Sequence, residues 1–259
     1  MRRGLAGARS TALGVVLGLA LAAPALAAPE VKSGSSSGPR GRLAPGDAVR
    51  EAFAFATAPG LADTTRVRLA DFLARYGRHP LARDAHHELG LLAYARADYA
   101  TAREQFRRAR PPAGGEEARY WEGLSAFALG RPRDARALVL PLARARRDTP
   151  RRWDAAYLVA LSWAQEGRRP EALAAYRELF ALAPRGGEAA ALYQAMRLAH
   201  ELGRGEEATQ WRARLLRTAP GSPEAASLRA EEKAASASAT GSRADSTARA
   251  AGRARPGGR

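Results

Sequence analysis

The residues that could perform chemistry are few and stand apart from one another. The chain has 259 residues with four histidines and no cysteine, which removes thiol nucleophiles and thiolate metal ligands. His86 and His87 are adjacent, so on a helix they point about 100° apart and cannot bind one metal as an i, i+4 pair would. No carboxylate spacing isolates an acid–base pair, and no glycine-rich phosphate loop is present. We therefore predict no enzymatic activity, no catalytic residue, no metal site and no cofactor.

The elements that would position binding residues are expected to be helices arranged in a repeat. Alanine recurs at spacings of 33, 37 and 36 residues, at Ala102, Ala135, Ala172 and Ala208. Seventeen residues before these markers stand Ala85, Ala118, Ala155 and Ala191. Five residues before them, where a left-handed residue would end the first helix of each pair, stand Ala97, Gly130, Gly167 and Gly203. Helical apolar periodicity without strand-like alternation predicts an all-α fold of stacked helical hairpins.

A period near 34 with this order of small, bend, aromatic and proline residues resembles the tetratricopeptide repeat (TPR). The best match runs from Asp154 to Pro184, and its motif positions are held by Gly167, Ala172, Tyr176, Leu182 and Pro184. The resemblance implies a right-handed α-solenoid over residues 46–221. Its repeats are expected at about 83–112, 116–147, 153–186 and 189–221, after a degenerate pair at 46–80.

Two shorter motifs resemble bacterial envelope families. The segment Ala118 to Gly123 is similar to the Ala-x-Tyr-Trp-x-Gly opening of repeats in the Tol–Pal-associated periplasmic coordinator family. Phe72, Tyr76 and Pro80 resemble the Phe-x-x-x-Tyr-Pro junction shared by that family and the outer-membrane assembly lipoproteins. Both resemblances imply an adaptor of the envelope. The chain departs from these families because it has no cysteine to lipidate and no room for an amino-terminal trimerising coiled coil.

The composition of the two ends of the chain predicts targeting and linking segments. Residues 1–27 combine early arginines, an apolar run and the small residues Ala25 and Ala27, which predicts a signal peptide and a secreted, periplasmic protein. The apolar run is too short to span a bilayer, so no transmembrane anchor is expected in the mature form. Residues 28–45 read as a flexible linker, 222–236 as a possible capping helix and 237–259 as a disordered basic tail.

The net charge of +16 favours anionic partners. Only Lys32 and Lys233 among the 42 basic residues are lysine, so a GC-rich coding bias explains the same excess. No nucleic-acid-binding module is recognisable, and no specific nucleic acid is expected as a partner.

The TPR resemblance implies that the first helix of each pair lines a concave groove. On the register of the alanine markers, the predicted groove residues are His87, Leu91, Tyr94, Tyr120, Leu124, Phe127, Tyr157, Leu161, Tyr193 and Arg197. The tyrosines are rigid amphipathic anchors for a peptide, or they pack between adjacent first helices. Asp84, Glu117 and Asp154 begin the same helices, as an acidic lip or as partners of the helix dipoles.

These observations predict a protein-interaction adaptor of the bacterial envelope that binds a partner peptide in its groove. The alternative is an electrostatic binder of anionic envelope polymer or lipid headgroups through the arginine-rich surface and tail.

Overall fold

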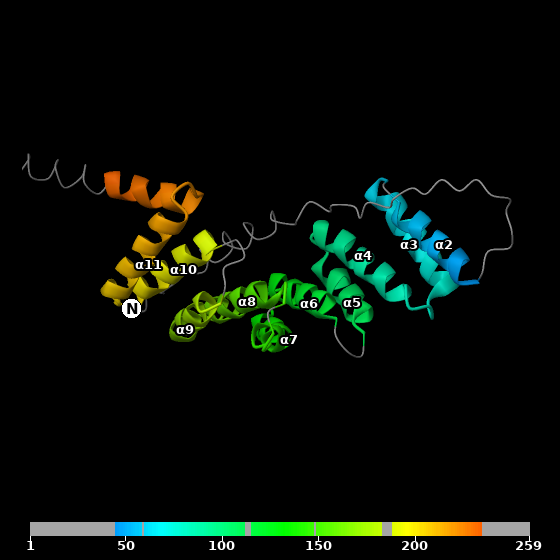
Figure 1. Ribbon diagram of the computed structural model, residues 1–259, viewed down its shortest axis with the longest axis horizontal. Helices are drawn as coiled ribbons and strands as arrows, with labels where there is room; N and C mark the ends of the chain where they lie inside the picture. The colour runs from blue at the N-terminus through cyan, green and yellow to red at the C-terminus, as the bar shows by residue number, and fades with distance from the viewer. Residues whose placement is uncertain (1–44, 59, 112–114, 148, 183–187, 235–259) are drawn as a thin grey trace, which may run out of the picture. The chain divides into compact units, whose positions relative to one another are not determined.

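The computed structural model describes residues 45–234, apart from 59, 112–114, 148 and 183–187 (Figure 1). All regular elements in these residues are helices, which confirms the all-α prediction. The chain forms two compact units, one ending at Arg168 and the other beginning at Arg169. The expected signal peptide with Ala25 and Ala27, the linker as far as residue 44 and the tail 237–259 lie outside the described residues.

The first unit contains seven described helices: α2 (Pro45–Thr57), α3 (Ala62–Tyr76), α4 (Ala82–Ala95), α5 (Tyr99–Ala109), α6 (Glu116–Ala128), α7 (Pro132–Ala143) and α8 (Arg152–Gln165). Each helix contacts the next one along the chain, as Figure 1 shows for α2 to α5. In addition, α2 contacts α4 and α6 contacts α8, which brings together the first helices of successive pairs. This is the packing expected of stacked hairpins.

Four first helices end in the same backbone geometry. The left-handed residue is Ala97 after α4, with φ of 60°, and Gly130 after α6, with φ of 71°. The amide of Ala97 donates to the carbonyl of Tyr94 at 2.9 Å, and the amide of Asp98 donates to Ala93 at 3.0 Å. These two bonds form a Schellman motif, which satisfies carbonyls that the helix end would leave unpaired. The same pair of bonds closes α8 at Gly167 and α10 at Gly203, so the expected bends are confirmed.

The alanine markers are points of close helix contact. All eight are buried: Ala85, Ala102, Ala118, Ala135, Ala155, Ala172, Ala191 and Ala208. Gly123 lies at the tightest approach, since a Cβ there would be 2.5 Å from Cγ1 of Val139 on α7. A Cβ at Gly90 would be 2.6 Å from the ring of Phe106 on α5. Small residues therefore set the distance between the two helices of a pair, as the sequence predicts.

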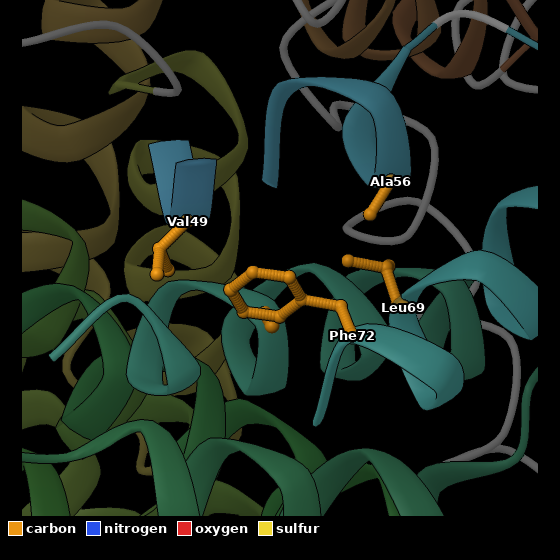
Figure 2. Packing of buried hydrophobic residues seen from close by; sticks show 5 residues of the cluster. Val49, Ala56, Leu69 and Phe72 are labelled. Atoms are coloured by element: carbon orange, nitrogen blue, oxygen red, sulfur yellow. The ribbon is translucent and has the colours of Figure 1, made fainter. Parts of the chain in front are cut away.

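The stretch expected to hold a degenerate first pair is a packed hairpin. Val49 and Ala56 on α2 face Leu69 and Phe72 on α3, and this cluster includes Ala85 on α4 (Figure 2). The rings of Phe53 and Phe72 meet edge to face at 5.4 Å. These contacts attach the first pair to the repeat that follows it.

The second unit contains α9 (Arg169–Phe180), α10 (Glu188–Glu201) and α11 (Gly205–Thr218), followed by helical residues 223–234. The amide of Ala225 donates to the hydroxyl of Ser222 at 3.1 Å, which caps the start of this last segment. Leu228 is buried against Leu192 and Leu215. The described part of the expected capping helix therefore covers α10 and α11. None of the helices in the described ranges combines the length and apolar character needed to cross a bilayer.

Candidate functional site

Eight of the ten predicted groove residues lie on the first helices of the first unit. Helix α4 carries His87, Leu91 and Tyr94, which are partly buried. The residues on α6 and α8 are Tyr120, Leu124, Phe127, Tyr157 and Leu161. Each of these five is only 6% exposed, so little of its side chain is accessible. At this degree of burial, the five side chains offer a partner little apolar surface.

An aromatic cluster centred on Trp121 joins α4, α5 and α6. The Trp121 ring lies 5.3 Å from the ring of Tyr94 and is stacked on Phe106 at 5.8 Å. Tyr94 also meets Tyr99 at 5.1 Å, and His87 meets Phe106 at 5.5 Å, both edge to face. Such aromatic pairs stabilise a fold by more than the burial of their apolar surface alone. The ring of Tyr94 therefore packs between the first helices α4 and α6, whereas the ring of His87 packs against α5 within its own pair.

A charged network anchored on Arg151 joins the starts of α6 and α8. The Arg151 guanidinium donates to both carboxylate oxygens of Glu117, at 2.6 and 2.5 Å. Its third nitrogen donates to Asp154 at 2.9 Å, and its centre lies 4.8 Å from the middle of the Tyr120 ring. The Trp121 indole N–H donates to Glu117 at 2.8 Å. The planar guanidinium suits this arrangement because it donates along two edges and stacks on a ring.

The acidic lip considered above is therefore partly neutralised. Burial would raise the pKa of Glu117, but the hydrogen bonds and charge of Arg151, together with the Trp121 indole, hold that pKa below its usual value. The hydrogen bonds of Glu117 also raise the pKa of Arg151. Both groups thus keep their charges at ordinary pH. The four side chains Asp84, Glu117, Asp154 and Arg151 together carry a formal charge of −2 (one cation, three anions).

Two tyrosine hydroxyls beside this network have no hydrogen bond among the described residues: those of Tyr94 and Tyr120. Burial raises the pKa of Tyr94 to about 12, with a smaller effect from Tyr99. Burial and the nearby Asp154 also raise the pKa of Tyr120. Both phenols therefore stay protonated and can donate to a carbonyl or accept from an amide.

His87 adds a third polar group to this face. Its Nε2 is buried and has no hydrogen-bond partner among the described residues. Burial lowers the pKa of His87, although the charges of Glu117 and Asp84 oppose the shift. The imidazole is therefore neutral at pH 7, and its unpaired nitrogen is available to a ligand that reaches it.

The remaining two predicted residues lie in the second unit. Tyr193 on α10 is partly buried beside the Leu192, Leu215 and Leu228 cluster, and its hydroxyl lies 3.5 Å from Glu231. Arg197 is exposed and lies 3.6 Å from Glu201, one turn further along α10. Tyr193 thus faces the last helical segment.

Sequence reasoning missed Arg151, which holds the site together, and used Trp121 only as part of a motif. Arg151 lies three residues before Asp154, which is the residue that matches Glu117 one repeat later, and no sequence spacing singles it out among the many arginines. No group of three or more metal-ligating side chains occurs in the described parts of the chain.

Comparisons with known proteins support the fold. No protein-family model and no curated protein matches this chain. Among solved structures it is similar to YrrB, described as a TPR protein with an unusual peptide-binding site, at 19% identity and a TM-score of 0.56 over 72% of this chain and 97% of YrrB. It is also similar to PilF of Pseudomonas aeruginosa, at 19% identity and a TM-score of 0.52 over 71% of this chain and 80% of PilF.

A third similar structure is a putative kinesin light chain with nearly identical TPR-like repeats from Podospora anserina. It shares 17% identity at a TM-score of 0.50, over 66% of this chain and 97% of that one. At this level of identity the likeness concerns the fold, and it confirms the TPR-like arrangement of helical hairpins. The narrower resemblance to the Tol–Pal-associated family stays a prediction.

Proposed function

We propose that this chain is a non-enzymatic interaction scaffold that binds a peptide segment of a partner protein on the face of α4, α6 and α8. The observation that carries the proposal is the pair of hydroxyls on Tyr94 and Tyr120, which lie on successive first helices and have no hydrogen bond within the described residues. The similarity to YrrB, whose structure is described as having a peptide-binding site, supports this choice.

The chemistry of this face suits the backbone of a peptide. A peptide unit offers one donor and one acceptor, and a phenol hydroxyl pairs with either. Arg151 is already held by Glu117 and Asp154, so it positions the Tyr120 ring and is not the ligand's principal partner. The remaining formal charge of −2 favours a peptide that carries a basic residue near Asp84.

The test is selection of binders from a random peptide library displayed on phage, followed by affinity measurement with the purified chain. The informative variant is Tyr94→Phe with Tyr120→Phe, because it deletes two hydroxyls and keeps both rings. We expect selected peptides to lose affinity by about tenfold, since a neutral hydrogen bond contributes about 0.5–1.5 kcal/mol.

The matched control is Tyr76→Phe on α3, whose ring packs against Phe72 at 5.2 Å and lies outside the predicted groove. It should leave the affinities unchanged. Selection of no peptide at all, or peptides that bind the double variant as tightly as the wild type, would exclude this face as the binding site.

We further propose that the scaffold works in the bacterial envelope after export. The signal-like segment 1–27 and the two envelope-type motifs support this location. Expression of the full chain in a bacterium, with fractionation and amino-terminal sequencing, tests it. A periplasmic product that begins at Ala28 is expected, whereas a cytoplasmic product that retains Met1 would contradict export.

A further inference from the structure

A pocket of about 660 Å³ on the first unit is lined by five arginines: Arg83, Arg107, Arg108, Arg110 and Arg119. They come from the start of α4, the end of α5 and the first turns of α6, elements that Figure 1 shows side by side. Pro111 and the short segment Ala137–Leu138 of α7 complete the lining. Five cations on one concave surface repel one another unless anions lie between them.

The carboxylates beside the pocket do not balance these charges. Glu104 accepts from both Arg107 and Arg108 at 2.9 Å. Glu122 lies 3.4 Å from Arg110. Arg83 and Arg119 have no side-chain hydrogen bond or ion pair in the described part of the chain. Five guanidinium groups and two carboxylates leave a formal charge of +3 at this place.

Two polar atoms near the pocket are also left without a hydrogen bond. Nε of Arg119 and Oε2 of Glu122 are both buried and form no hydrogen bond among the described residues, although Oε2 is the atom that lies 3.4 Å from Nη1 of Arg110. Burial raises the pKa of Glu122 despite the opposing charge of Arg110. An unpaired guanidinium N–H in a cationic pocket can donate a hydrogen bond to a bound anion.

We propose that this pocket binds a phosphoryl group through Arg83, Arg119 and Arg110. A single carboxylate would leave most of the excess charge in place. A phosphoryl group carries up to two negative charges, and its three oxygens accept from several guanidinium groups at once. The site is separate from the tyrosine face of α4, α6 and α8, so it neither needs nor replaces the peptide scaffold.

The test compares three probes on the full chain: inorganic phosphate, tripolyphosphate and vesicles that contain phosphatidylglycerol. Calorimetry measures the first two, and co-sedimentation measures the third. The pocket variant is Arg83→Gln with Arg119→Gln, because these arginines have no ion pair to lose. The control is Arg131→Gln with Arg133→Gln at the other end of the α6–α7 pair, which removes the same charge from exposed positions.

We expect saturable binding of at least one probe, weakened about tenfold or more in the pocket variant and less than about threefold in the control. Circular dichroism should show the same helical content in both variants, and Arg83→Gln alone should already weaken binding. The probe that binds identifies the source of the phosphoryl group as free phosphate, a phosphate chain or a lipid headgroup. Equal weakening by both variants would mean diffuse attraction to the basic surface and would overturn the site, as would the absence of saturable binding to any probe.

Discussion

The guanidinium of Arg151 and the carboxylate of Glu117, 34 residues apart, form a bidentate pair with distances of 2.6 and 2.5 Å. Because Glu117 lies in the first turn of α6 and Arg151 directly precedes α8, this pair ties the start of α6 to the start of α8. It also fixes the guanidinium above the ring of Tyr120. One contact therefore serves both the stacking of repeats and the geometry of the candidate site.

Replacing Arg151 should weaken the stacking of these repeats. In Arg151→Ala, Glu117 and Asp154 lose their cation, and we expect the free energy of unfolding to fall by about 1–2 kcal/mol after allowance for solvent screening. Urea denaturation measures the change. The control is Arg147→Ala, because Arg147 is 85% exposed and lies 3.8 Å from Glu116. If both variants lose the same free energy of unfolding, the bidentate pair stabilises the fold no more than the exposed ion pair of Arg147 does.

The close approach of α6 and α7 should tolerate no added methyl group. Gly123→Ala places a Cβ about 2.5 Å from Val139, and we expect destabilisation by about 1–3 kcal/mol, as for other overpacked interiors. The double variant with Val139→Ala should recover part of this loss, because it frees the space. Thermal unfolding followed by circular dichroism provides the comparison. A single variant as stable as the wild type would contradict the packing described here.

Substitutions at two of the left-handed bend residues should change the stability of the chain in opposite directions. Ala97 has φ of 60°, where a Cβ is strained, so Ala97→Gly should stabilise the chain by about 0.5–1 kcal/mol. Gly130 has φ of 71° and open space around it, so Gly130→Ala should destabilise the chain by about 1 kcal/mol through backbone strain alone. Chemical denaturation of both variants checks the signs. Changes of the same sign in both would refute the shared geometry.

Acid should weaken the fold through His87. Its pKa lies below the ordinary value of 6.5 because the ring is buried, with Arg151 adding to the shift and Glu117 and Asp84 opposing it. As the pH falls below 6.5, the unfolded chain takes up the proton first, so stability declines until the folded-state pKa is reached. The wild type should therefore lose more stability than His87→Gln between about pH 7.5 and about pH 5.

The comparison with His87→Gln is needed because the half-buried Glu88 and the buried Glu122 change stability with pH in the opposite direction. Burial raises the pKa of both carboxyls, and the folded state then binds protons more readily than the unfolded state. The difference between wild type and variant isolates the histidine. His200→Gln, at an exposed position on α10, is the matched control. Parallel stability curves for wild type and His87→Gln would exclude the histidine as the cause.

The sequence by itself determined the hairpins, their bends and their contact points. A helix that ends in a left-handed residue needs glycine or a tolerated alanine at one position, as at Gly130 and Ala97. A helix that approaches within contact of another backbone needs a small residue, as at Gly123. These are demands of the local backbone, so they leave a residue type at a fixed spacing that can be read without coordinates.

Only the tertiary structure decided which charges meet and which side chains remain available. Arginine is long and flexible, and the chain offers many carboxylates within reach, so spacing alone does not select Glu117 for Arg151 or bring Arg83 beside Arg119. Likewise, register placed Tyr94 and Tyr120 on first helices, but their burial beside Trp121 and Arg151 depends on how α4, α5, α6 and α8 pack. Local backbone geometry restricts the residue type at single positions, so it can be predicted from the sequence. The pairing of charges and the exposure of side chains depend on surfaces that form only when the helices pack together.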